Sequence, residues 1–232
     1  MMESLDLLLQ ALSDCIRALP MTLFLSIVSV IIGICISVPL AVMLQRNTIF
    51  TPLIKAYVFF FTGSPLLVQL YIFYFGIPSI GFIQDLMQQP GFEFLKDGKI
   101  YIFAALGLNT AAYTTQIFSG SIKNMDRKEV EAAYAYGMDR KQTMRRVILP
   151  SSLRRALPAY SNEVLMTIHA TSLASTVTIN EVTNAASLFN STFYEPFIAY
   201  TAAGIVYLCL TFSFIYLYKL VEKKLVLASK SL

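Results

Sequence analysis

The amino-acid sequence predicts an all-α integral membrane protein with five transmembrane helices. The first observation is composition, because 56% of the 232 residues are hydrophobic and only 14% are charged. Soluble domains carry about 25% charged residues. The second is a series of long apolar runs, of which the core of a soluble protein would explain only one. The third is the uneven distribution of basic residues. The length allows about one domain.

Five apolar runs approach the roughly 20 residues that a helix needs to cross the hydrocarbon layer. In chain order they are 21–44, 54–75, 100–121, 163–179 and 197–217. The fourth run is short and rich in Thr and Ser, which suits the interior of a helix bundle better than a lipid-facing surface. Five spans would place the two termini on opposite sides of the membrane.

The segments before and after these spans are polar or amphipathic. Residues 1–19 are expected to form a periplasmic amphipathic segment, since their leucines follow helical spacing and the first 17 residues lack the basic n-region of a signal peptide. Pro20 is expected to mark the start of the first span. The transmembrane domain is predicted over residues 20–220, and residues 221–232 are predicted to form a cytoplasmic tail.

Lys and Arg set the expected orientation, because cytoplasmic segments of membrane proteins are enriched in them. Segments 45–55, 122–160 and 218–232 contain 15 of the 18 basic residues. We therefore expect an external N-terminus and a cytoplasmic C-terminus. The same distribution explains the net charge of +4 without a nucleic-acid partner. The three cysteines have no disulfide or metal-ligand spacing, so no metal site is expected.

The cytoplasmic segment 122–160 has the pattern of two helices joined by a tight turn. Residues 128–136 favour helix by propensity, and Gly137 suits the left-handed position after a helix end. Asp139 and Gln142 have the spacing of a capping box for a second helix, which is expected to stop near Pro150. Such a projection would fit a groove on a soluble partner. The alternative is a solvated basic loop that only determines topology.

This segment resembles the coupling signature of permease subunits in bacterial ATP-binding-cassette importers. The matching positions are Glu131, Ala132, Ala133, Gly137, Leu149 and Pro150. The resemblance implies the type I importer permease fold, with a cytoplasmic coupling helix that docks into an ATPase subunit. It also implies a second permease, either a similar chain or a second copy, and an external solute-binding protein. This chain has no P-loop, so ATP and Mg would be bound by the partner ATPase and no cofactor by this chain.

Four other stretches resemble signatures of permeases for polar amino acids. They are residues 62–69, 108–118, 160–164 and 171–174. Thr62 replaces the usual Arg of the first signature, and Gln116 stands where many members have Glu. The resemblance is closest to the histidine, lysine, arginine and ornithine systems, especially the arginine type. It implies import of basic amino acids across the bacterial inner membrane.

Polar residues in the third and fourth spans are the candidates for a substrate pathway. Asn109, Tyr113 and Gln116 recur at helical spacing and share a face. Two interpretations of this stripe remain, a pathway wall or hydrogen bonds between helices. The other candidates are Asn162, Glu163, Thr171 and Ser172.

Glu163 also has two interpretations. It would either stabilise a helix N-terminus or present a carboxylate to a cationic substrate. His169 does not share its helix face.

The sequence also excludes some functions and leaves rivals. It contains no Gly-x-Ser-x-Gly, His-Glu-x-x-His or Cys-x-x-Cys pattern, so we expect no enzyme and no catalytic residue. One rival is a permease for another polar amino acid, such as glutamine or cystine. A second is an ion-coupled secondary transporter, which would normally show internal repeats and paired broken helices. A third is a membrane scaffold that transports nothing.

Overall fold

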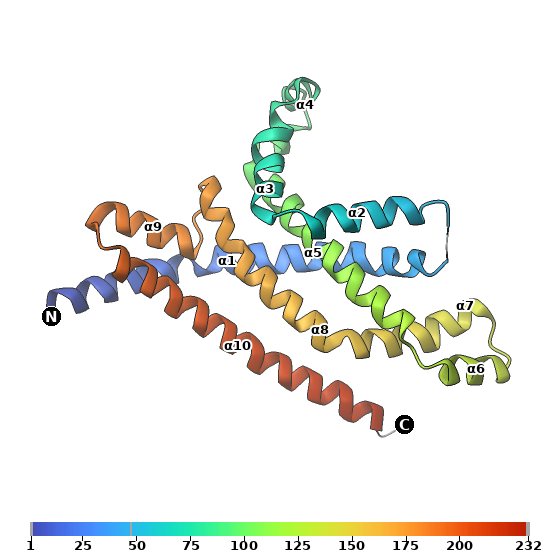
Figure 1. The fold of residues 1–232 in the computed structure, drawn as a ribbon. Coiled ribbons are helices and arrows are strands. Elements are labelled where there is room, and N and C mark those ends of the chain that lie inside the picture. The colour runs from blue at the N-terminus through green and yellow to red at the C-terminus, as the bar shows by residue number, and fades with distance from the viewer. Residues whose placement is uncertain (1, 47, 231–232) are drawn as a thin grey trace.

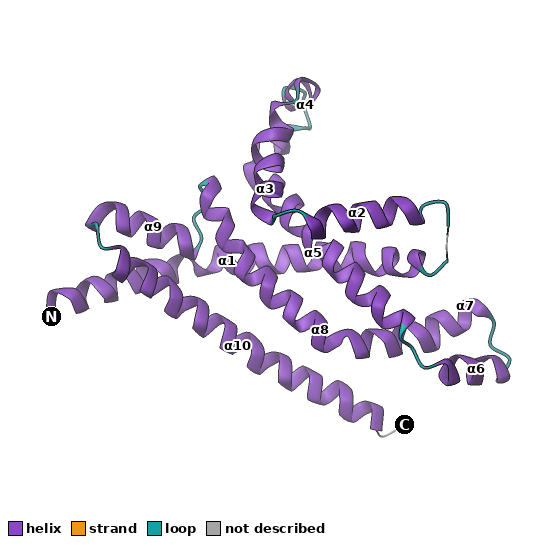
Figure 2. Cartoon of the chain, viewed as in Figure 1, coloured by secondary structure: helices purple, strands orange, loops and turns teal. Residues whose placement is uncertain are grey.

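The structure, a computed structural model, describes residues 2–46 and 48–230, and all regular secondary structure in these residues is helical (Figures 1 and 2). The predicted all-α class is confirmed. The α-helices are α1 (Met2–Leu44), α2 (Thr51–Gly63), α3 (Leu66–Tyr71), α4 (Gly81–Met87), α5 (Gly98–Lys123), α6 (Arg127–Ala135), α7 (Arg140–Thr143), α8 (Leu149–Ala170), α9 (Val182–Phe193) and α10 (Pro196–Lys230).

Two of the described helices, α1 and α10, are long and apolar enough to cross a membrane. The bent pair formed by α2 and the helix after it adds a third candidate. Helices α5 and α8 contain the predicted third and fourth runs but do not pass the same test of length and hydropathy. Five spans therefore stay a prediction.

Helix α1 continues through Pro20 and Pro39 without a break. Pro20 therefore lies inside a helix that begins earlier in the chain, and the start of the first membrane span at this residue stays a prediction. Proline removes one backbone hydrogen bond, but tertiary contacts hold the helix before this point. Ala11, Cys15 and Ala18 are buried in a cluster with residues of α9 and α10.

The second apolar run is not one straight helix. α2 ends at Gly63, Ser64 is extended as is usual before proline, and the chain turns by 106°. The side chain of Gln69 is buried and its Nε2 donates to the backbone oxygens of Phe61 at 2.9 Å and Ser64 at 3.0 Å. Gly63 and Pro65 lie at this interruption, and Gln69 satisfies carbonyl groups that the break frees.

The fourth run lies in a helix that begins much earlier than expected. The predicted capping box of Asp139 and Gln142 is present at the start of α7. The chain then continues through a π-helical turn, Met144–Ile148, into α8. The predicted stop near Pro150 is wrong, because the π-helical turn leads directly into α8 and this proline lies in the first turn of α8. The α-helix ends at Ala170 and is followed by a 3-10 segment, Thr171–Val177.

Helix α5 is the centre of the bundle, with its most extensive contacts to α1 and further contacts to α8 and α2. Two glycines allow α1 and α5 to approach closely. A Cβ atom on Gly33 would lie 2.7 Å from Cγ2 of Thr110, and one on Gly107 would lie 2.7 Å from Cγ2 of Ile32. Small residues at such crossings permit close packing of membrane helices. The α6–α7 hairpin projects from the opposite end of the bundle to α9 (Figure 1).

Candidate functional site

A cavity of about 630 Å³ lies between α5, α8 and the break after α2. We call it the central cavity. Four of the predicted pathway residues line it, and they are Asn109, Tyr113, Asn162 and Glu163. Its wall also contains Ser64, Pro65, Thr110, Met166 and Thr167. The structure therefore brings together the polar residues of two predicted spans at the broken helix.

Glu163 lies inside α8 rather than at its start. The interpretation of this residue as a helix N-terminal charge is therefore wrong, since Leu149 begins the helix. The side chain is 9% exposed and lines the central cavity. Across the described residues, its carboxylate forms no hydrogen bond and no ion pair. An acidic group in this position is costly in a membrane protein unless it serves a ligand or a partner.

Asn109 has a structural partner on each side of the broken helix. Its Nδ2 donates to the backbone oxygen of Phe61 at 3.1 Å and to Oε1 of Gln69 at 2.9 Å. Tyr113 donates its hydroxyl to the backbone oxygen of Thr62 at 3.3 Å and keeps 37% of its surface exposed. Of the two interpretations of the stripe, hydrogen bonding between helices thus explains the polar side chain of Asn109. Tyr113 makes such a bond and also lines the cavity with an exposed side chain.

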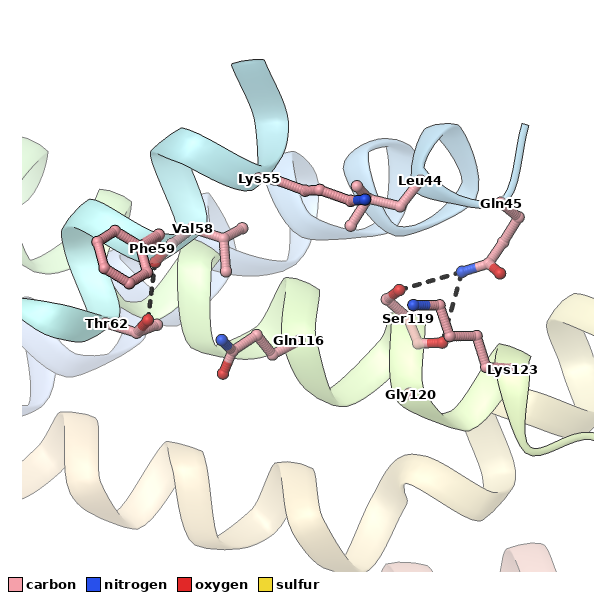
Figure 3. A pocket seen from close by; sticks show the side chains of 10 residues that line it. All are labelled: Leu44, Gln45, Lys55, Val58, Phe59, Thr62, Gln116, Ser119, Gly120 and Lys123. Carbon is pink, nitrogen blue, oxygen red and sulfur yellow. Dashed lines mark hydrogen bonds between the residues drawn. The ribbon is translucent and has the colours of Figure 1, made fainter. Parts of the chain in front are cut away.

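The remaining predicted pathway residues do not line the central cavity. Gln116 lines a second cavity beside α2 (Figure 3). Thr171 is fully buried and donates to the backbone oxygen of Ile168, and Ser172 donates to that of His169, both at 2.7 Å. These two hydroxyls therefore form hydrogen bonds to the backbone three residues earlier in the chain.

His169 lies on a different face from Glu163, as predicted, and its Nε2 is 2.9 Å from Oγ1 of Thr211 on α10.

Three residues that shape the site are not among the predicted site residues. The hydroxyl oxygens of Thr110 and Thr167 are 2.9 Å apart and join α5 to α8 in the cavity wall. Neither threonine falls on the polar stripe of Asn109 and Tyr113. Gln69, the last residue of the signature 62–69, organises the helix break.

The projecting hairpin is held by local hydrogen bonds at each of its corners. Asp126 caps α6 by accepting from the backbone N–H of Lys128 at 3.0 Å. Gly137 has φ of +78°. The N–H groups of Gly137 and Met138 donate to the carbonyls of Tyr134 at 2.9 Å and Ala133 at 3.1 Å. This pair of bonds is the Schellman motif, in which glycine is preferred at the left-handed position.

Glu129 attaches the hairpin to α8. Its Oε2 accepts from the Ser151 hydroxyl at 2.9 Å, and its Oε1 pairs with Arg155. Leu149 packs beside a buried cluster that includes Phe118 and Ile122 of α5. The hairpin is therefore attached to α8, which packs on α5, and these two helices form much of the central cavity.

The outward surface of the hairpin is open. Glu131 and Ala132 are exposed, whereas Ala133 is buried. Tyr134 and Tyr136 expose 48% and 86% of their surfaces. Exposed aromatic residues on a compact helical projection are typical of a surface that docks into a partner.

One broken apolar helix beside a cavity with polar side chains in its wall, together with a helical projection joined to α8, is typical of a membrane-embedded transport component. The chain belongs to the family of binding-protein-dependent transport system inner membrane components, which matches residues 33–227. The resemblance inferred from the sequence signatures is confirmed.

Curated relatives and solved structures agree with this assignment. The nopaline transport system permease protein NocM of Agrobacterium fabrum is 39% identical over 90% of this chain and 86% of its own length. The histidine/lysine/arginine/ornithine transport system permease protein HisM of Salmonella typhimurium is 40% identical over 88% of this chain and 86% of its own length. A crystal structure of an amino acid ABC transporter with histidines has a TM-score of 0.77 and 28% identity, covering 91% of this chain and 94% of that one.

Proposed function

We propose that this chain is the permease subunit of an ATP-driven importer for basic amino acids, arginine above all, with histidine, lysine and ornithine as further substrates. The observation that carries the proposal is the unpaired Glu163 carboxylate in the central cavity. A carboxylate there would attract the cationic side chain of such a substrate. The 40% identity to a histidine/lysine/arginine/ornithine permease supports the same substrate class.

The proposed assembly contains a second permease, two ATPase subunits and a periplasmic solute-binding protein. It lies in the bacterial inner membrane, with five spans, an external N-terminus and a cytoplasmic C-terminus. The hairpin would dock into an ATPase subunit, which binds ATP and Mg. Nucleotide-driven movement would then reach α8 through Glu129 and through the continuous connection from α7. In this mechanism the central cavity opens alternately to the two sides of the membrane.

The test is the ATPase activity of the assembly, purified through a tag on this chain and reconstituted with its binding protein. Arginine should stimulate hydrolysis and glutamine and cystine should not. Stimulation by glutamine or cystine alone would select the rival polar amino-acid permease. Uptake that survives loss of the ATPase would instead support the ion-coupled secondary transporter.

The role of Glu163 has a separate test. Glu163→Gln keeps the size of the side chain and removes its charge. Uptake of arginine should fall at least tenfold, because a charge interaction with the substrate that contributes about 1.4 kcal/mol of binding free energy is lost. Glu195→Gln, in the loop before α10, removes an exposed carboxylate away from the cavity and serves as the control. Unchanged uptake by a normally expressed Glu163→Gln variant would refute the recognition role.

A further inference from the structure

A second cavity of about 630 Å³ lies between α2, α5 and the end of α1 (Figure 3). We call it the vestibule. Its lining combines two lysines with neutral polar and apolar side chains, namely Leu44, Gln45, Lys55, Val58, Phe59, Thr62, Gln116, Ser119, Gly120 and Lys123. Both lysines belong to segments that the charge distribution predicts to be cytoplasmic.

The vestibule continues the wall of the central cavity along α5. Tyr113 lines the central cavity, and Gln116, Gly120 and Lys123 line the vestibule. Steps of three, four and three residues place these four positions on one side of the helix. At 1.5 Å per residue, this stripe extends about 15 Å from Tyr113 to Lys123. It leads from the central cavity to the predicted cytoplasmic end of α5.

The opposite wall of the vestibule is a matching stripe on α2. Thr62, Phe59 and Lys55 line the vestibule at steps of three and four residues. Tyr113 of the central cavity donates its hydroxyl to the backbone oxygen of Thr62 of the vestibule at 3.3 Å, so this contact lies between the two cavities. A substrate that leaves the central cavity between α2 and α5 would therefore pass this contact first and the two lysines last.

The charge of the vestibule is uncompensated. None of the described residues that line it is acidic, and neither lysine belongs to an ion pair within residues 2–46 and 48–230. The amide of Gln45 is held by the Ser119 hydroxyl at 3.1 Å and the Ala41 carbonyl at 3.3 Å. Gln116 is exposed in the cavity, without a hydrogen bond to the described part of the chain. The inner end of the vestibule, beside Gln116, therefore suits a polar occupant such as water or substrate.

We propose that Lys55 and Lys123 form a positively charged collar that opposes the return of cationic amino acids from the cytoplasm. The inference rests on the proposed transport of basic amino acids. Cavity walls of low dielectric focus the field of such charges on the space between them. A cation about 8 Å from each ammonium group would be disfavoured about two- to threefold by each lysine and about fivefold by both together. The collar thus lowers the occupancy of the vestibule by cytoplasmic arginine, and so weakens inhibition of import from that side, without contributing to substrate recognition in the central cavity.

The experiment measures inhibition by substrate on the cytoplasmic side in proteoliposomes that contain the whole assembly. ATP inside and binding protein outside select assemblies in one orientation. The measured quantity is the internal arginine concentration that halves the import of labelled arginine. Lys55→Gln/Lys123→Gln should lower this concentration about fivefold, and Lys55→Arg/Lys123→Arg should leave it unchanged. At 0.5 M salt the difference should shrink, because exposed charges are screened.

The control is Lys219→Gln/Lys223→Gln, which removes two exposed charges from α10 on the same predicted side of the membrane and should have no effect. An unchanged or increased half-inhibiting concentration in the Lys55→Gln/Lys123→Gln variant overturns the proposal. So does an effect that appears only with anionic phospholipid present, which would assign the lysines to a lipid headgroup. Absence of arginine import by the unmodified assembly would instead refute the proposed substrate.

Discussion

Substitution of Gly137 tests whether the backbone of the hairpin turn, rather than the space around it, determines docking. A Cβ atom at this position would have no other heavy atom within 4 Å, and the residue has φ of +78°. The cost of Gly137→Ala therefore comes from the left-handed conformation alone, about 1–2 kcal/mol for an L-residue. Because this cost weakens the turn between α6 and α7, the affinity for the partner ATPase should fall by up to about tenfold.

The assay is binding of the purified ATPase subunit to the permease in nanodiscs, together with ATP-driven arginine import. The matched variant is Gly137→Asn, since asparagine tolerates the left-handed region better than alanine. We expect binding by Gly137→Asn to lie closer to that of the unmodified protein. Thermal stability of the helix bundle should be the same in both variants, because the turn lies outside the packed helices.

Two results would refute this reasoning. Equal, undiminished binding by both variants would show that docking does not require the turn. An equally large loss in both would show that a bare glycine is needed for contact with the partner, because the conformational cost differs between alanine and asparagine.

Three further predictions concern packing, coupling and pH. Gly33→Ala places a Cβ atom 2.7 Å from Thr110 and should destabilise the bundle by about 1–3 kcal/mol, whereas Gly204→Ala, with no neighbour within 4 Å, should not lower the melting temperature. Glu129→Ala removes the ion pair and hydrogen bond that attach the hairpin to α8. The side chain of Glu129 is 38% exposed, so the pair contributes about 1 kcal/mol or less to stability. Import should fall more than ATP hydrolysis, and an equal fall in both would contradict the coupling role. Burial raises the pKa of the Glu181 carboxyl above its ordinary value of 4.5, although hydrogen bonds oppose the shift. Its contribution to unfolding free energy should therefore decline as pH rises from 4.5 through the raised folded pKa, and melting curves of Glu181→Gln should lack this decline.

The sequence was most informative where structure depends on residues close together in the chain. The Gly137 turn and the capping box of Asp139 and Gln142 were predicted correctly, because their hydrogen bonds span only a few residues. The interruption at Gly63 and Pro65 followed from the same local chemistry.

Prediction failed where distant segments decide the outcome. The amphipathic segment 1–19 and the first apolar run were expected as separate segments, but α1 joins them through Pro20, and buried contacts with α9 and α10 support its N-terminal part. Glu163 was placed near a helix start from hydropathy, whereas α8 begins at Leu149 through a π-helical turn and a tolerated proline.

The polar stripe of α5 shows most clearly what the sequence by itself determined about this protein. Helical periodicity placed Asn109, Tyr113 and Gln116 on one side of a helix. Only the tertiary structure assigned them different surroundings, because α2 turns by 106° just after Gly63. Asn109 thereby meets the freed carbonyls, Tyr113 faces the central cavity, and Gln116 opens into the vestibule. The family and the local turns can be recognised from short segments of the sequence. The cavities form only where helices that are distant in the chain pack beside one another.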